Sequence, residues 1–154
     1  MARRARSTHE LRQKLAERAA RPADLEPLLE DLTDRAWLDD RRFAREYART
    51  RAGRRYGRYR IAQELRRKGV AAEHIAEALA EVFPGERDER VLVRKRIEKR
   101  LKGQRPPYPE RLLRSLYASL LRAGFPSAII RDELLGRARG RLPDELALDE
   151  DERA

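Results

Sequence analysis

Residues 38–70, which read LDDRRFAREYARTRAGRRYGRYRIAQELRRKGV, decide the fold of this 154-residue chain. The stretch opens on Asp39, whose carboxylate can accept a hydrogen bond from a free backbone N–H of a first helical turn. With Asp39 as N-cap, Leu38 and Phe43 occupy the N′ and N4 positions of a hydrophobic staple. Asp40 adds negative charge near the positive end of the helix dipole. These residues together predict the start of an amphipathic helix.

The same stretch contains two helix ends. The first helix is expected to run to about Arg51 and to end before Gly53. The second is expected to end at Gly69, a residue suited to the left-handed C′ position. Leu65 and Val70 then occupy the two positions that touch in a Schellman motif. A sharp turn between two helices is therefore predicted at Gly69.

Similar signals divide the rest of the chain. Ser7–Glu10 form a capping box, Pro84-Gly85 end a helix, and Gly124-Phe125 repeat the stop at Gly69. No segment alternates between apolar and polar residues with a period of two over a useful length. We therefore predict an all-α protein.

Apolar positions recur at shifts of about 50 and 55 residues. Aligning Gly69 with Gly124, for example, brings Leu65 onto Leu120. Small helical units of this kind bury their faces against neighbouring units, so tandem three-helix repeats in an elongated array are expected. The predicted divisions are an incomplete two-helix repeat over 7–36, three-helix repeats over 37–83 and 87–139, and a disordered acidic tail over 140–154.

Positive charge is concentrated in two blocks. The chain has 37 Lys and Arg against 27 Asp and Glu, a formal net charge of +10. Residues 41–68 carry twelve basic side chains against two acidic ones, and residues 90–111 carry nine against two. Such blocks favour a polyanionic partner, either nucleic acid or a nucleoprotein. Ion pairs between helices are the alternative explanation.

Composition excludes several classes of protein. The chain has no cysteine, so it has no disulfide and no cysteine-ligated metal. It also lacks an apolar run long enough to span a bilayer, and its start lacks the apolar core of a secretory signal. We expect a soluble cytoplasmic protein.

The residues that could support catalysis are few. His9 and His74 each lie in a predicted helix, without a cysteine or a constellation of paired carboxylates to form a catalytic site. Asp39 and Asp40 are explained by helix capping, and Gly53 and Gly57 are weak evidence for a phosphate-binding loop. No enzymatic activity, cofactor or metal is therefore expected.

The segment from Gln63 to Ile75 has the outline of a helix-turn-helix motif. The helix that would enter the major groove is acidic, however, since it carries Glu73, Glu77 and Glu81. These carboxylates would repel DNA phosphates, so sequence-specific DNA recognition is not favoured.

The segment from Arg51 to Arg60 mixes arginines with two tyrosines, Tyr56 and Tyr59. Arginine binds phosphate, and tyrosine can stack on an unpaired base. We expect Tyr56 to pack within the joint between two helices and the neighbouring arginines to bind an anion.

The chain resembles the RecX family, regulators of the bacterial RecA recombinase. The resemblance covers roughly residues 7–136, and its specific part is 37–70. It is carried by Ser7–Leu15, Trp37–Asp40 with Phe43-Ala44, Arg55–Gly57 through Ile61, Glu64-Leu65 with Lys68–Val70, and Leu121–Phe125.

This resemblance implies tandem three-helix repeats that form a curved rod in the helical groove of a RecA–DNA filament. It also implies inhibition of RecA's ATPase, strand exchange and filament extension, and hence a role in recombination, DNA repair and the SOS response. Some family members also bind single-stranded DNA. The implied partners are therefore the RecA filament and single-stranded DNA, with the chain acting as a monomer. The short N-terminus and the acidic tail depart from the family pattern.

Combining charge with resemblance gives a hypothesis for the site. A basic face would meet filament DNA or an acidic RecA surface, while motif residues would serve as scaffold. The basic face comprises Arg42, Arg45, Arg49, Arg54, Arg55, Arg58, Arg94, Lys95, Lys99 and Lys102. The scaffold comprises Leu38, Asp39, Asp40, Phe43, Tyr56, Gly57, Leu65 and Gly69. Two other functions remain open: a stand-alone, sequence-tolerant nucleic-acid-binding protein, and a helical adaptor for another acidic protein.

Overall fold

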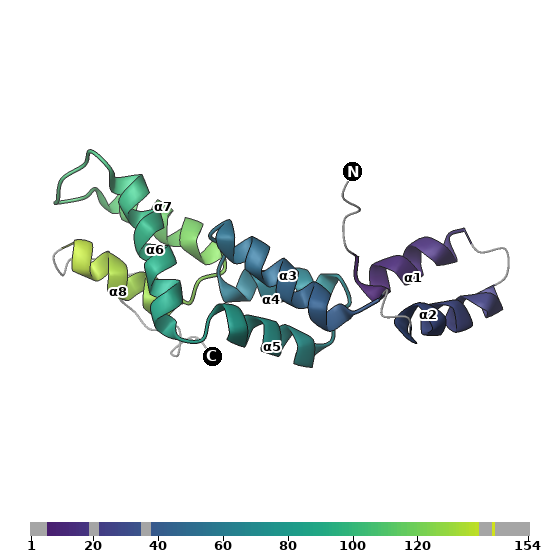
Figure 1. The fold of residues 1–154 in the computed structure, drawn as a ribbon. Coiled ribbons are helices and arrows are strands. Elements are labelled where there is room, and N and C mark those ends of the chain that lie inside the picture. The colour runs from purple at the N-terminus through teal and green to yellow at the C-terminus, as the bar shows by residue number, and fades with distance from the viewer. Residues whose placement is uncertain (1–5, 19–21, 35–37, 139–142, 144–154) are drawn as a thin grey trace, which may run out of the picture. The chain divides into compact units, whose positions relative to one another are not determined.

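The computed structural model of the chain describes residues 6–18, 22–34, 38–138 and 143. Within these ranges every regular element is helical, which confirms the all-α prediction (Figure 1). The elements are α1 (Thr8–Ala16), η1 (Pro22–Asp24), α2 (Leu25–Asp34), α3 (Asp40–Gly53), α4 (Arg58–Arg67), α5 (Ala72–Val82), α6 (Glu86–Leu101), α7 (Glu110–Arg122) and α8 (Ser127–Arg137). Trp37 and the predicted acidic tail, apart from residue 143, lie outside the described residues.

The predicted start and stop signals are confirmed. The Asp39 carboxylate accepts a hydrogen bond from the Arg42 backbone N–H at 2.9 Å, as an N-cap does. Gly69 has a φ of +74°, and the Val70 N–H donates to the Leu65 carbonyl at 3.2 Å, which completes a Schellman motif. Local side-chain and backbone hydrogen bonds therefore set these helix ends.

One predicted helix end is wrong. α3 does not end before Gly53 but includes it, and the left-handed residue in the following turn is Arg55, with a φ of +63°. The turn must bring the Gly57 N–H to the Ala123 carbonyl, to which it donates at 2.8 Å. We attribute the position of the turn between α3 and α4 to this tertiary hydrogen bond rather than to Gly53.

The chain divides into two compact units. The first contains residues up to Ala52 together with Ile61–Val82, and the second contains Gly53–Arg60 together with the chain from Phe83 onward. The boundaries of the predicted three-helix repeats remain a prediction.

In the first unit, polar contacts tie the start of α1 to α3 and to the end of α4. The Asp40 carboxylate accepts a hydrogen bond from the Thr8 N–H at 2.8 Å, and the Ser7 hydroxyl donates to the Lys68 carbonyl. Glu10 of the predicted capping box also pairs with the Lys68 ammonium at 2.5 Å. The motif at residues 7–10 thus serves both as a cap and as a tertiary contact.

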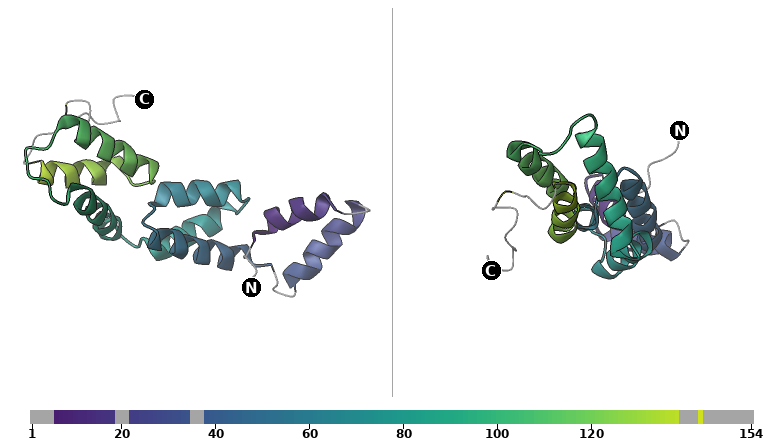
Figure 2. Two further views of the ribbon diagram at one scale, coloured as in Figure 1. Left: turned by 90° about the horizontal axis from the view of Figure 1, so that it is seen from above. Right: turned by 90° about the vertical axis from the view of Figure 1, so that its left-hand side faces the viewer.

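In the second unit, α6, α7 and α8 pack around one apolar core (Figure 2). Each helix contributes buried aliphatic side chains, and Phe125 follows the stop at Gly124 into the core. The central buried residues are Val93, Ile97, Leu113, Leu116, Leu120, Phe125, Ile130 and Leu134. Basic side chains on α6 and α7 are consequently carried by helices that share this core.

Candidate nucleic-acid interface

The predicted basic residues of α3 contact carboxylates of their own unit. Arg42 donates to Glu46 at 2.9 Å along the same helix. Arg45 lies 3.2 Å from the carboxylate of Glu81 on α5, and Arg49 pairs with the same group. Each of these guanidiniums therefore already has an anionic partner.

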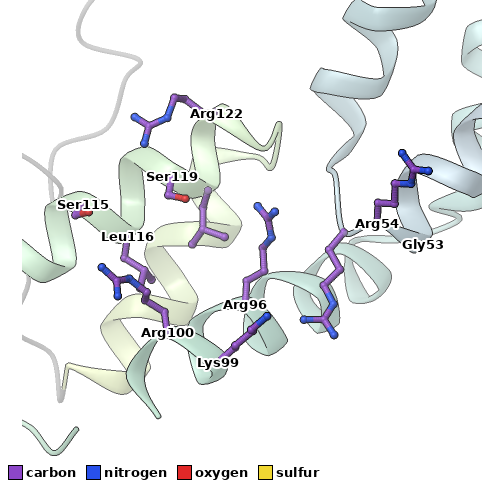
Figure 3. Close-up of a pocket in the computed structure, with 11 residues that line it drawn as sticks. Gly53, Arg54, Arg96, Lys99, Arg100, Ser115, Leu116, Ser119 and Arg122 are labelled. Atoms are coloured by element: carbon purple, nitrogen blue, oxygen red, sulfur yellow. The ribbon is translucent and has the colours of Figure 1, made fainter. Parts of the chain in front are cut away.

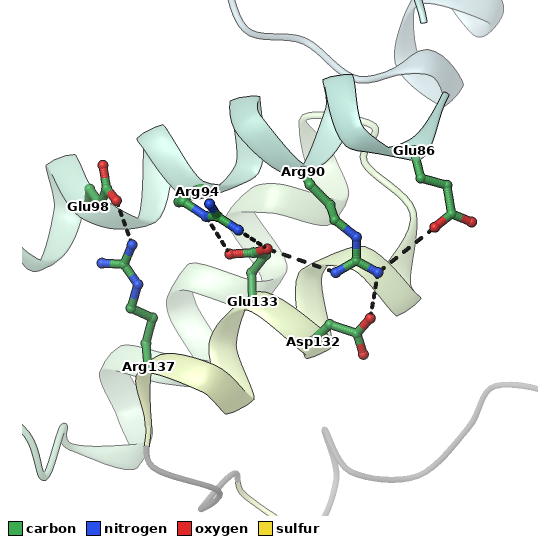
Figure 4. Close-up of polar contacts among 7 residues, drawn as sticks. All are labelled: Glu86, Arg90, Arg94, Glu98, Asp132, Glu133 and Arg137. Carbon is green, nitrogen blue, oxygen red and sulfur yellow. Dashed lines mark hydrogen bonds and ion pairs between the residues drawn. The ribbon is translucent and has the colours of Figure 1, made fainter. Parts of the chain in front are cut away.

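Two further predicted residues are paired in the second unit. Arg94 makes two hydrogen bonds to Glu133 of α8, at 3.0 and 3.1 Å, within a row of ion pairs between α6 and α8 (Figure 4). Arg58 donates at 2.5 Å to Glu89, whose side chain is fully buried. The hydrogen bond to Glu133 raises the pKa of the Arg94 guanidinium above its ordinary value. These two arginines fasten helices together.

The remaining five predicted basic residues make no ion pair within the described parts of the chain. They are Arg54, Arg55, Lys95, Lys99 and Lys102, and all five are exposed. Their charges are thus available to a ligand.

Three of these five line a pocket of about 810 Å³ in the second unit (Figure 3). The loop after α3 contributes Arg54 and Arg55, and α6 contributes Lys99. Lys95 and Lys102 do not line it. The complete lining is Gly53, Arg54, Arg55, Arg96, Lys99, Arg100, Ser115, Leu116, Ser119, Leu120 and Arg122, which includes six cations and no carboxylate.

Three of the six cations were missed by the sequence hypothesis. Arg96 and Arg100 share a face of α6 with Lys99, because positions i, i+3 and i+4 lie together on a helix. Arg122 extends from α7. The helical spacing on α6 could have revealed two of them, whereas the approach of α7 could not be read from sequence.

Arg96 is the half-buried member of this cluster. Burial lowers the pKa of its guanidinium, and the positive charges of Arg55 and Arg60 lower it further, against an opposing contribution from Tyr56. The guanidinium of Arg60 lies 4.6 Å from the centre of the Tyr56 ring, and that of Arg96 lies 5.9 Å from it. Tyr56 therefore packs against two guanidinium groups. This position favours a packing role beside the pocket over stacking on a base.

The predicted scaffold residues occupy a range of environments. Phe43, Gly57 and Leu65 are buried, Leu38, Asp40 and Tyr56 are half-buried, and Asp39 is exposed. Their scaffold role remains a prediction.

Two other kinds of feature are absent from the described residues. They hold no group of three or more acidic, histidine or cysteine side chains arranged to bind a metal ion. None of their helices combines the length and the apolar character that crossing a membrane requires.

Comparison with known proteins gives one consistent family. The family model described as "RecX, second three-helix domain" matches residues 39–79. The regulatory protein RecX of Halorhodospira halophila is 47% identical over 79 residues, which are 51% of this chain and about half, 49%, of that relative.

Two other matches extend over most of the chain. The regulatory protein RecX of Chromobacterium violaceum is 35% identical over 138 residues, covering 90% of this chain and 86% of the relative. A crystal structure of a regulatory protein RecX matches with a TM-score of 0.71 and 27% identity, covering 84% of this chain and 64% of that one. The breadth of the match to the Chromobacterium relative shows that this protein belongs to the RecX family.

Proposed function

We propose that this protein regulates RecA by binding in the groove of the RecA–DNA filament and restraining its ATPase, strand exchange and extension. The observation that carries the proposal is the similarity to a regulatory protein named RecX, which covers 90% of this chain. A regulator of this kind acts by binding rather than by catalysis.

The electrostatics of the chain support this proposal. A net charge of +10 draws the protein toward a polyanionic filament, and the six cations of the pocket concentrate that charge in one place. The arginines of α3 already pair with Glu46 and Glu81, so the pocket supplies the more available contact.

A stand-alone nucleic-acid-binding protein is the second candidate function. It is favoured by the pocket itself, because that pocket would attract phosphates whether or not RecA were present. The two candidates differ in whether RecA is required for the protein to act.

DNA-stimulated ATP hydrolysis by the RecA of the same organism tests the proposal. The protein is titrated into a preformed RecA filament on circular single-stranded DNA, and strand exchange is followed in parallel. Falling ATP hydrolysis and slower strand exchange are the expected results. Unchanged rates, under conditions where the protein remains folded by circular dichroism, would contradict the proposal.

A further inference from the structure

The pocket of the second unit gathers like charge without an internal counter-charge. Arg54, Arg55, Arg96, Lys99, Arg100 and Arg122 line it, and no carboxylate does. Elsewhere in the same unit arginines have carboxylate partners, for example Arg94 with Glu133. Holding six cations around one volume costs free energy through mutual repulsion, and a bound anion would relieve that cost. The pocket is therefore suited to a ligand with several negative charges.

The rest of the lining suits phosphate oxygens in particular. Ser115 and Ser119 are one turn apart on α7, are exposed, and can donate hydroxyl hydrogen bonds into the pocket. Arginine can bind phosphate through two parallel N–H bonds, and lysine adds a point charge. The pocket lacks an exposed aromatic wall that would make a base or another apolar group its principal ligand.

The shape of the pocket discriminates between nucleic acids. A volume of about 810 Å³ is comparable to that of small-ligand pockets, about 300–1,000 Å³, and could enclose a short piece of phosphodiester backbone. A single strand is flexible enough to bend adjacent phosphates into a concavity. A duplex is stiff over about 50 nm and presents its phosphates on a convex surface. The concave arrangement of cations thus favours the single strand.

We propose that this pocket is a phosphate-binding site that takes adjacent backbone phosphates of single-stranded DNA. This inference rests on the proposed function for its choice of DNA, but it assigns the contact to the pocket of the second unit rather than to the arginines of α3. Lys99, Arg100 and Arg122 contact phosphate from α6 and α7, while Arg54 and Arg55 close the site from the loop after α3.

Two lysines of α6 provide a matched test. Lys99 lines the pocket and Lys95 does not, although both are exposed, lie one turn apart and make no ion pair within the described residues. Lysine and glutamate have similar helix propensities, so neither Lys99→Glu nor Lys95→Glu should unfold the helix. Circular dichroism melting checks that both variants keep the wild-type fold.

Binding is measured by fluorescence anisotropy with a labelled oligothymidylate at physiological salt. Lys99→Glu should weaken binding about tenfold or more, and Lys95→Glu should weaken it much less. In a salt titration, Lys99→Gln should also reduce the slope of log affinity against log salt by about 0.7, the contribution of one single-strand phosphate. Equal losses in the two Glu variants would overturn the assignment of the pocket.

Two further ligands identify the source of the phosphate. A duplex of the same length should bind more weakly than the oligothymidylate, and ATP at equal total phosphate should fail to displace it. Displacement by ATP would reassign the pocket to free nucleotides, and equal affinity for duplex would overturn the preference for a single strand.

These outcomes are separate from those of the RecA assay. Wild-type protein that inhibits RecA while Lys99→Glu and Lys95→Glu bind DNA equally would refute the pocket and leave the proposed function intact. Selective loss of DNA binding in Lys99→Glu, together with no effect of the wild-type protein on RecA, would refute the proposed function and leave the pocket intact.

Discussion

Gly57 and Gly124 lie in direct backbone contact. Their approach is so close that a Cβ atom built on Gly57 would lie 2.3 Å from the Gly124 carbonyl oxygen. The Gly57 N–H donates to the Ala123 carbonyl at 2.8 Å, and the Tyr59 N–H donates to the Gly124 carbonyl at 3.1 Å. These contacts dock the start of α4 on the end of α7. They also hold the chain just after Arg54 and Arg55, two residues of the basic pocket.

Gly124→Ala should therefore destabilise the second unit strongly. Its φ of +89° is unfavourable for a residue with a Cβ, and that Cβ would lie 2.3 Å from the backbone nitrogen of Arg60. Strain and steric overlap together should lower the free energy of unfolding by about 3 kcal/mol. Urea denaturation followed by circular dichroism measures the loss.

Gly136→Ala is the matched control in the same unit. Gly136 lies in α8, and a Cβ built there meets nothing within 4 Å. Alanine at this position should stabilise the helix by up to about 1 kcal/mol, since glycine has the greater entropy to lose on folding. Similar destabilisation by Gly124→Ala and Gly136→Ala would show that the close contact is not important.

Gly69→Ala tests the stop of α4 in the first unit. Gly69 has a φ of +74°, and a Cβ there would lie 2.3 Å from the His9 Cβ on α1. We expect a loss of at least about 1 kcal/mol in unfolding free energy with a proportionate loss of activity. Loss of activity at full stability would mean that Gly69 contacts the partner directly.

Gly103→Ala separates strain from steric overlap. Gly103 also has a left-handed φ, +82°, but a Cβ there would meet nothing within 4 Å. Its substitution should cost about 1 kcal/mol through backbone strain alone. In the same denaturation experiment, Gly103→Ala should lower the free energy of unfolding by less than Gly69→Ala does. The reverse order would rule out the overlap with His9.

Glu89→Ala should destabilise the second unit by about 3 kcal/mol. The buried Glu89 carboxylate accepts hydrogen bonds from the Arg58 backbone N–H at 3.0 Å and from its guanidinium at 2.5 Å. Removing it leaves the first turn of α4 without its cap and the Arg58 guanidinium without its buried partner.

Glu89→Gln distinguishes the two contributions of this carboxylate. Its amide oxygen can still accept the backbone hydrogen bond, so the loss in unfolding free energy should be clearly smaller than for Glu89→Ala. Thermal denaturation compares the two variants. Equal losses would mean that the negative charge, rather than the cap, is what α4 requires.

Replacing Arg45 and Arg49 together by glutamine tests whether α3 contacts DNA. Both arginines pair with Glu81 in partly exposed positions, and such pairs contribute about 1 kcal/mol or less each. We expect modest destabilisation and a smaller loss of single-strand affinity than Lys99→Gln causes, as measured by anisotropy. A larger loss than Lys99→Gln would place the DNA contact on α3 instead.

The helix ends could be predicted because they depend on neighbouring residues. Asp39 caps α3 through the backbone N–H of Arg42, three residues away, and Gly69 ends α4 through hydrogen bonds within six residues. The position of the left-handed residue after α3 could not be predicted. It depends on the hydrogen bond between Gly57 and Ala123, which are far apart in the sequence.

The sequence also could not show which basic residues are available to a ligand. The sequence shows that Arg45, Arg94 and Lys99 are all charged and helical, but not that the first two face Glu81 and Glu133 on other helices. The pocket likewise depends on packing that brings α7, the end of α3 and the turn at Arg54-Arg55 to one face of α6. Sequence patterning therefore predicted three of the six cations that line the pocket and missed the other three.

The most direct measurement is RecA ATP hydrolysis on single-stranded DNA at a fixed amount of this protein, as further free single-stranded DNA is added. A regulator that binds the filament itself should continue to inhibit when free DNA is abundant. Inhibition that disappears as free DNA rises would show simple competition for DNA, and would contradict the proposal that this RecX family member acts on the RecA filament.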